Sequence, residues 1–161
     1  MKPFDTGLNA AIQHVASKLF PTGYDVADVA PDTLETLTQH IETTGRMVVW
    51  SGASDNTIYA DAEVNWAFRA WHDWCHWKAQ LPFTLAGEIA ALDMQIDHLK
   101  TLGLWTAFRE AALRAEVEGG ARLFEITGRF PDEPRRFALT WLKRHGVTHN
   151  DQGKPLAELA H

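Results

Sequence analysis

The sequence predicts a mostly α-helical single domain, a bundle of about five or six helices with at most a short β or extended segment near residues 46–50. Its 161 residues have the length of one domain and can bury a sizeable core. Hydrophobic residues make up 45% and charged residues 22% of the chain, as in an ordinary soluble globular protein. Residues that favour helix ends recur along the chain, whereas only the run RMVVW is typical of a strand.

Six segments carry helix signals. The expected helices span about residues 6–20, 32–45, 61–80, 84–101, 104–127 and 131–146. Asp32 and Glu35 have the spacing of a capping box, and Thr84 can cap the fourth helix. Pro134 suits the first turn of the last helix, and Gly146 is the expected stop. These signals divide the chain into helices joined by short connections.

Two segments lie outside the expected helices. RMVVW at residues 46–50 is followed by the turn-rich SGASDN. A strand needs a partner and no second run is convincing, so this segment is expected to be extended chain lying on the helices. Residues 147–161, VTHNDQGKPLAELAH, are largely polar. We therefore expect one helical domain over residues 1–146 and a loosely attached C-terminal tail over residues 147–161.

The composition argues against several classes of function. A formal charge of -6 and the lack of a Lys/Arg cluster do not suit nucleic-acid binding. The single cysteine, Cys75, excludes an internal disulfide and a multi-cysteine zinc site, and it suits a reducing compartment. No stretch reaches the roughly 18 apolar residues of a spanning helix. We expect a cytoplasmic protein without a membrane or nucleic-acid partner.

The segment NWAFRAWHDWCHW, residues 65–77, holds four of the seven tryptophans of the chain. On a helix, residues three or four apart share a face. That spacing gathers polar residues into one stripe, formed by Asp61, Asn65, Arg69, His72 and His76. Rings and small apolar residues fill most other directions, which predicts a helix nearly surrounded by protein with the stripe in a cleft. The alternative is an amphipathic helix whose stripe faces water, although such faces more often use Lys and Glu.

Two later helices each place a carboxylate among apolar residues. Glu88, with Gln95, falls in the apolar sector of its helix, and Glu116 shares a face with Gly119-Gly120. A buried carboxylate needs a partner, a proton or a metal ion. Glycines inside a helix cost about 1 kcal/mol each, so they indicate close approach of another helix or a ligand. Two alternatives remain: Glu88 in a first turn reaches solvent and favours the helix dipole, and Arg109 pairs with Glu116.

Together these residues predict a metal site. His72 and His76 are spaced so that one ion can bind both from one helix, as in HExxH zinc sites. Glu88 and Glu116 would complete a shell of two histidines and one or two glutamates. The expected cofactor is a divalent metal ion, with zinc as the first candidate and iron or manganese as alternatives.

A metal ion of this kind acidifies a bound water to a pKa of about 7, so a metal-dependent hydrolase is the expected function. Asp73 and Glu116 are the candidate catalytic groups. Asn65 and Arg69 would bind an anionic small molecule, such as a phosphorylated or nucleotide-like substrate. The alternative is a non-enzymatic binding or inhibitor protein with a buried polar His/Glu network. A homo-oligomer stays open, since seven tryptophans are many for one small core.

The same helix resembles two groups of proteins. The pattern N-x-x-x-R-A-x-H-D-x-x-H, here Asn65, Arg69, Ala70, His72, Asp73 and His76, resembles that of small, largely uncharacterised phage-type helical proteins. That resemblance implies a role in a virus-infected bacterial cell and brings no established activity. The His72-Asp73 pair is also similar to the doublet of HD-domain phosphohydrolases, helical enzymes that often act on nucleotides. The second resemblance implies metal binding by His40, His72 and Asp73, with Asp132 as a downstream partner.

Overall fold

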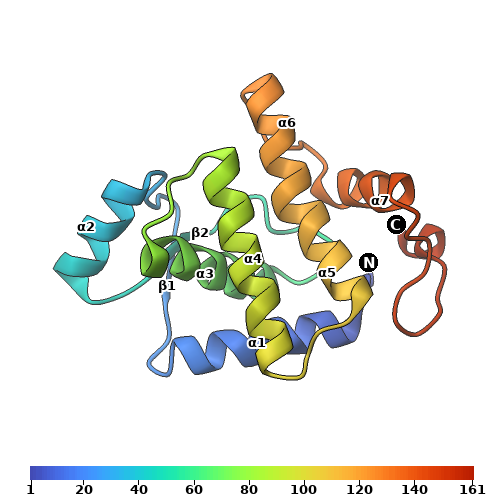
Figure 1. Ribbon diagram of the computed structural model, residues 1–161, viewed down its shortest axis with the longest axis horizontal. Helices are drawn as coiled ribbons and strands as arrows, with labels where there is room; N and C mark the ends of the chain where they lie inside the picture. The colour runs from blue at the N-terminus through green and yellow to red at the C-terminus, as the bar shows by residue number, and fades with distance from the viewer.

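The computed structural model describes all 161 residues, most of which lie in helices (Figure 1). Its elements are α1 (Thr6–Leu19), β1 (Asp25–Ala27), α2 (Leu34–Thr44), β2 (Val48–Trp50), α3 (Ala62–Ala79), α4 (Leu85–Thr101), α5 (Ala107–Arg114), the π-helical turn η1 (Ala115–Gly119), α6 (Gly120–Thr127), α7 (Pro134–Arg144) and the 3-10 helix η2 (Leu156–Leu159). Since α5, η1 and α6 follow one another without a break, they count as one helix. The predicted mostly α-helical fold is confirmed. None of the helices combines the length and apolar character that crossing a bilayer requires.

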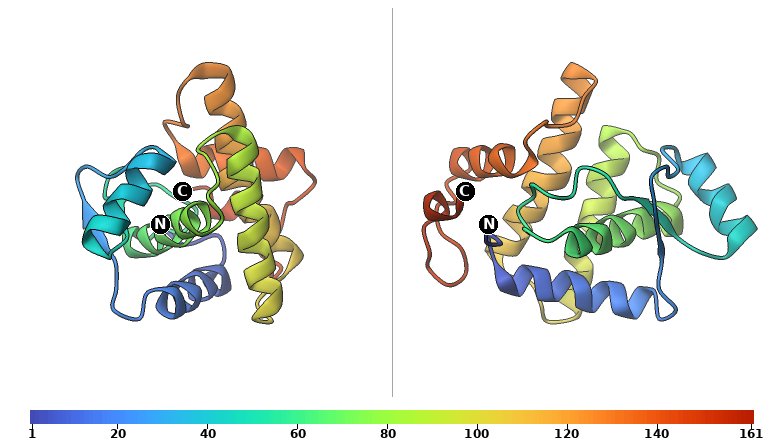
Figure 2. Two further views of the ribbon diagram at one scale, coloured as in Figure 1. Left: turned by 60° about the vertical axis from the view of Figure 1, so that its left-hand side comes forward. Right: turned by 180° about the vertical axis from the view of Figure 1, so that it is seen from behind.

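Helix α3 lies in the middle of the fold, with α1, α2, α4 and β2 packed around it (Figures 1 and 2). Trp71 and Cys75 are fully buried in the main core, and the polar residues Asn65 and His76 are buried as well. Helix α1 covers α3 with an apolar face of Leu8, Ala11, Ile12 and Val15. The expectation that protein nearly surrounds this helix is therefore confirmed.

The caps of two helices show how well local signals locate helix ends. Thr84 accepts a hydrogen bond from the Gly87 N–H and begins α4, as expected. The capping box of α2 is one residue further along than expected, with Thr33 and Thr36 in place of Asp32 and Glu35. Thr33 has the extended backbone that an N-cap needs, and the two threonine hydroxyls satisfy each other's backbone N–H groups.

Strand β2 has a partner that the sequence did not indicate. It pairs in parallel with β1, in the register Asp25–Val48, Val26–Val49 and Ala27–Trp50. The guanidinium of Arg46 reaches across to the Asp25 carboxylate, with N···O distances of 3.0 and 3.1 Å. Strand β1 is only three residues long and largely exposed, so it has no alternating pattern to find.

Residues 147–161 are packed against the domain, and the expected loose tail and its boundary at residue 146 are wrong. Leu156 and Leu159 are buried in the main core. The Asn150 side-chain amide donates a hydrogen bond to the Phe4 carbonyl oxygen at 2.9 Å. Two buried leucines and a buried asparagine thus attach a segment whose composition is largely polar.

Arg135 joins the two ends of the chain to the loop before α3. It is 2% exposed, and its guanidinium donates hydrogen bonds to the carbonyl oxygens of Lys2, Thr57 and Leu159. The guanidinium also lies 4.6 Å from the centre of the Phe4 ring. Buried carbonyl groups without donors are costly, so this one side chain satisfies three segments that are distant in sequence.

We predict that Arg135→Met destabilises the fold by about 2 to 4 kcal/mol, because it keeps the stem but leaves the carbonyl oxygens of Lys2 and Leu159 without a donor, while that of Thr57 keeps the Ala60 N–H. Urea unfolding followed by tryptophan fluorescence measures this change. Arg136→Met is the matched control, since the neighbouring side chain is 79% exposed and should change stability by less than about 0.5 kcal/mol. Equal unfolding midpoints for the two variants would contradict the role assigned to Arg135.

Candidate metal site

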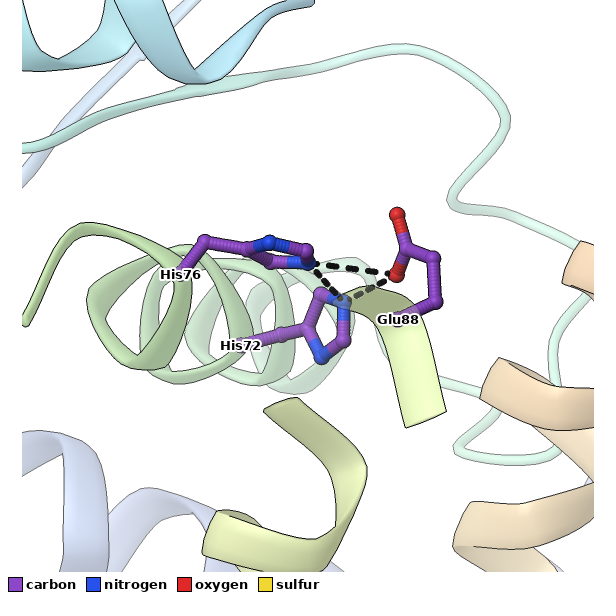
Figure 3. A group of neighbouring side chains, drawn as sticks. All are labelled: His72, His76 and Glu88. Carbon is purple, nitrogen blue, oxygen red and sulfur yellow. Dashed lines mark hydrogen bonds and ion pairs between the residues drawn. The ribbon is translucent and has the colours of Figure 1, made fainter. Parts of the chain in front are cut away.

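His72 and His76 project from one face of α3 toward Glu88, which lies in the first turn of α4 (Figure 3). Nε2 of His72 is 2.6 Å from Oε2 of Glu88, and Nε2 of His76 is 3.3 Å from the same oxygen. The two Nε2 atoms are 3.1 Å apart. All three ligand atoms thus lie within 4.8 Å of one another, and three of the four expected metal ligands come together.

The second nitrogen of each imidazole is held by a carbonyl oxygen. Nδ1 of His76 is 2.8 Å from the Leu81 carbonyl oxygen, and Nδ1 of His72 is 2.8 Å from Oε1 of Gln95. A carbonyl oxygen can only accept, so the proton lies on each Nδ1 and each Nε2 keeps a lone pair when the ring is neutral. Metal-binding histidines in proteins commonly have this arrangement, which fixes both the tautomer and the ring orientation.

The loop between α3 and α4 sets the distance between the ligands. Gln80 ends α3 in a left-handed conformation with φ of 52°. A Cβ atom on Gly87 would lie 1.8 Å from the Pro82 carbonyl oxygen, so only glycine permits this close approach. Phe83 packs edge-on against His76, with ring centres 4.4 Å apart. The tight loop therefore places Glu88 next to the two histidines, and its Phe83 ring packs against His76.

Burial and charge act in opposite directions at these three residues. Burial would raise the pKa of Glu88, but the hydrogen bonds and positive charge of the two histidines lower it to about 2. Burial would lower the pKa of His72, but the hydrogen bond and charge of Glu88 raise it instead. The carboxylate is thus kept ionised next to a position that favours positive charge. A divalent cation is one group that fulfils this requirement.

The donor atoms fit a divalent metal ion. Zinc binds His nitrogen and Glu oxygen at about 2.0–2.2 Å, which places tetrahedral neighbours about 3.3 Å apart. The separations of 3.1 and 3.3 Å match this spacing, whereas the 2.6 Å contact is that of a hydrogen bond. Two imidazoles and one carboxylate suit zinc and also iron or manganese. Three protein ligands leave coordination positions for water and substrate.

Glu116, the fourth expected ligand, is not part of this group. It lies half-buried on η1 without a hydrogen-bond partner. Arg69 is the charged residue that affects its pKa. Burial raises the pKa of Glu116 to about 7, although Arg69 acts in the opposite direction. Arg109, the alternative partner, instead donates to the Leu104 carbonyl oxygen and forms an ion pair with Asp151. Glu116 is therefore a partly buried carboxyl group outside the group of His72, His76 and Glu88, without a hydrogen-bond partner.

The glycine pair after Glu116 is explained in part by another helix. A Cβ atom on Gly119 would lie 2.9 Å from Trp141 and 3.0 Å from Phe137, both on α7. Gly120 is less restricted, because its nearest neighbour, Phe130, is 3.8 Å away. The glycines also adjoin the π-helical turn that carries Glu116. Such turns are rare and are frequent at functional sites, but they have no sequence pattern by which we could have predicted this one.

Asp73 lies beside the group without joining it. It is half-buried and has no hydrogen-bond partner. Burial raises the pKa of Asp73 to about 6, while the charges of His72 and His76 limit the rise. A carboxyl group of this pKa exchanges protons near neutral pH, as a general acid or base must.

Asn65 and Arg69 contact the loop that follows β2. The Asn65 amide donates to Oγ of Ser54 at 2.9 Å. Nη1 of Arg69 donates to the carbonyl oxygens of Trp50 and Gly52, each at 2.6 Å, and the guanidinium lies 5.3 Å from the centre of the Trp50 ring. These contacts give both residues a role in positioning the loop. Their predicted role in binding substrate stays a prediction.

The ligand set expected from the HD-domain resemblance is not assembled. His40 is on α2, and neither it nor Asp73 belongs to the group formed by His72, His76 and Glu88. Asp132 is exposed before α7 and is not in the group either. The geometry therefore favours the ligand set derived from the helix faces over the set implied by the doublet.

We predict that Glu116→Gln raises stability at about pH 8 by roughly 1 to 2 kcal/mol and has little effect at about pH 5. The pKa of Glu116 is raised in the folded state, so ionisation destabilises the fold as the pH rises through 7. Unfolding by urea at both pH values measures the difference. Glu125→Gln, an exposed position on α6, controls for the loss of charge. A Glu116→Gln effect of equal size at both pH values would refute this account.

Comparison with known proteins adds no family to this geometry. No protein-family model matches the chain, and neither the curated proteins nor the solved structures contain a significant match. The resemblances to phage-type helical proteins and to HD-domain enzymes stay predictions. Function must therefore be inferred from the arrangement of His72, His76 and Glu88 and the groups around them.

Proposed function

We propose that the protein is a metal-dependent hydrolase whose ion is held by His72, His76 and Glu88. The observation that carries this proposal is the convergence of both Nε2 atoms on one carboxylate oxygen while each Nδ1 is held by a carbonyl oxygen. Two neutral imidazoles in this tautomer aim lone pairs at a carboxylate, which is unfavourable unless a cation lies between them. Two histidines and one glutamate with open positions are typical of catalytic zinc sites.

The reaction class follows from the groups around the ion. A bound divalent ion would lower the pKa of a coordinated water to about 7 and supply a nucleophile. Asp73, with a pKa of about 6, is suited to accept a proton at neutral pH. Glu116, with a pKa of about 7, is partly protonated there and is suited to donate one. The site would then contain a base and an acid in addition to its metal ligands.

An anionic small molecule is the substrate class we propose. Arg69 is the cation whose charge acts on both Asp73 and Glu116. Its Nη1 is occupied by the loop after β2, but Nη2 has only a 3.5 Å contact with the Ala53 carbonyl oxygen. That edge of the guanidinium can donate hydrogen bonds to a phosphate or carboxylate oxygen. A phosphorylated or nucleotide-like compound in the cytoplasm would fit these groups.

One observation favours the second candidate, a non-enzymatic binding or inhibitor protein. The 2.6 Å contact between His72 and Glu88 is a short, charge-assisted hydrogen bond that needs no metal ion if the imidazole is protonated. In that case the His/Glu group is a buried polar network that holds α3 and α4 together. Metal content distinguishes the two candidates directly.

We predict about one equivalent of zinc, iron or manganese in protein purified without chelators or affinity tags, measured by elemental analysis. His76→Ala should lose the ion because it removes one ligand and its carbonyl-bound ring. His14→Ala, an exposed position on α1, should retain it. Glu88→Gln gives an isosteric second variant if circular dichroism shows that His76→Ala fails to fold. Absence of metal from the wild-type protein, even after incubation with each ion, would refute the metal site.

We further predict that the metal-loaded protein hydrolyses a member of a panel of phosphomonoesters, phosphodiesters and nucleotides. Asp73→Asn should retain the ion and lower kcat by roughly a hundredfold or more, as expected for loss of a general base. Asp97→Asn, an exposed position on α4, should keep full activity. Full metal content with no turnover on any substrate would leave the site structural and rule out hydrolysis of these compounds.

A further inference from the structure

Helix α6 projects from the body of the molecule and ends beyond the neighbouring helices (Figures 1 and 2). Its main contacts are with η1 and α4, which lie near its beginning. Large apolar side chains are exposed on opposite sides of its end: Phe124 is 45% exposed and Phe130, just after the helix, 62%, while Ile126 on the other side is 83% exposed. Phe124 and Phe130 stack on each other with ring centres 4.7 Å apart. Grouped exposed apolar side chains of this kind mark an interaction surface.

The apolar face of α6 extends past the helix that covers it. Gly119, Leu123 and Ile126 have the spacing of residues on one helix face. At Gly119 this face packs tightly against Trp141 and Phe137 of α7. Leu123, one turn later, lines an open hollow, and Ile126 is almost fully exposed. The face is therefore covered at one end and uncovered at the other.

The hollow between α6 and α7 has a volume of about 460 Å³. Leu123 forms its α6 wall, and Phe137 and Trp141 form its α7 wall. Pro131, in the connection between the two helices, lines it as well. One hairpin, α6 and α7 with their connection, thus carries both projecting apolar side chains and an apolar hollow. A self-complementary interface between two identical chains requires both features on one surface.

The charges along α7 also suit a second copy of the chain. Asp132 and Glu133 are exposed where α7 begins, and Lys143 and Arg144 are exposed where it ends. Asp132, Glu133, Arg136 and Arg144 line the hollow, and Arg136 pairs with Glu133 at 3.3 Å, so Asp132 is the acidic group at this end that has no ion pair within the chain. A two-fold axis across the hairpin reverses α7 in the second copy. The acidic end of one helix then meets the basic end of the other, whereas a foreign partner would need a matching pattern of its own.

We propose that the α6–α7 hairpin, residues 120–144, is the interface of a two-fold homodimer in which each α6 tip lies in the hollow of the other copy. The four helices of the two hairpins bury Ile126 and Leu123 at the centre of this interface. Charged residues of opposite sign form its rim, as is usual for protein interfaces. The proposal does not depend on a metal ion, because His72, His76 and Glu88 lie on α3 and α4.

Sedimentation of the full chain over a range of concentrations tests the proposal. The expected result is a species of twice the 18.1 kDa chain mass. Ile126→Asp should raise the dimer dissociation constant at least roughly tenfold. Val29→Asp is the matched control, since this residue is 84% exposed before α2, outside the hairpin, and should leave the dimer intact. A wild-type monomer at every concentration, or an Ile126→Asp dimer as stable as the control, would overturn the proposal.

A charge exchange tests the two-fold arrangement itself. Asp132→Lys and Arg144→Glu should each weaken the dimer, because each brings like charges together across the interface. The double variant should restore the dimer, since the two exchanged charges would again be opposite in sign where the copies meet. Both residues are exposed, so neither change should unfold the chain. A double variant weaker than both single variants would rule out this pairing.

Discussion

The hydrogen bond between Nδ1 of His76 and the Leu81 carbonyl oxygen is the constraint on which the site depends. His76 is fully buried, so its ring nitrogens must have partners inside the protein. The partner of Nδ1 is a backbone group of the loop that joins α3 to α4, and that loop turns tightly enough to require glycine at position 87. The next residue is Glu88. This hydrogen bond thus fixes the tautomer of His76. It also holds the loop that places Glu88 in the first turn of α4.

Two tryptophans of α3 hold neighbouring elements in place. Nε1 of Trp66 donates to the Ser51 carbonyl oxygen after β2, and Nε1 of Trp71 donates to Nδ1 of His98 on α4. Each large ring therefore buries apolar area and anchors a different neighbouring element through its polar edge. Phe68 stacks on the His72 ring with centres 6.0 Å apart. Rings flank the imidazoles, so the orientation of both imidazoles is held by packing and by hydrogen bonds.

The features that could be predicted from the sequence are those set by residues close together in the chain. The i, i+4 spacing placed His72 and His76 on one face, and the apolar sector around Glu88 indicated that it points inward. Glu116 lies outside the group of His72, His76 and Glu88, on a π-helical turn that 3.6-residue periodicity does not predict. The sequence did not indicate the partner strand β1 or the packing of the C-terminal segment, for another reason. They depend on contacts between residues far apart in sequence, such as Arg135 with Lys2 and Leu159.

The two carboxyl groups without partners strengthen the case for chemistry at this site. Burial raises the pKa of Asp73 to about 6 and that of Glu116 to about 7. Ionisation of either group at neutral pH therefore lowers the stability of the folded protein. An uncharged residue at either position would avoid this penalty. The buried hydroxyl of Tyr59 also has no partner, and the charges of Glu116 and Arg69 act on it. A purely structural network would have paired such groups, so Asp73, Glu116 and Tyr59 support the proposal of chemistry in this region of the fold.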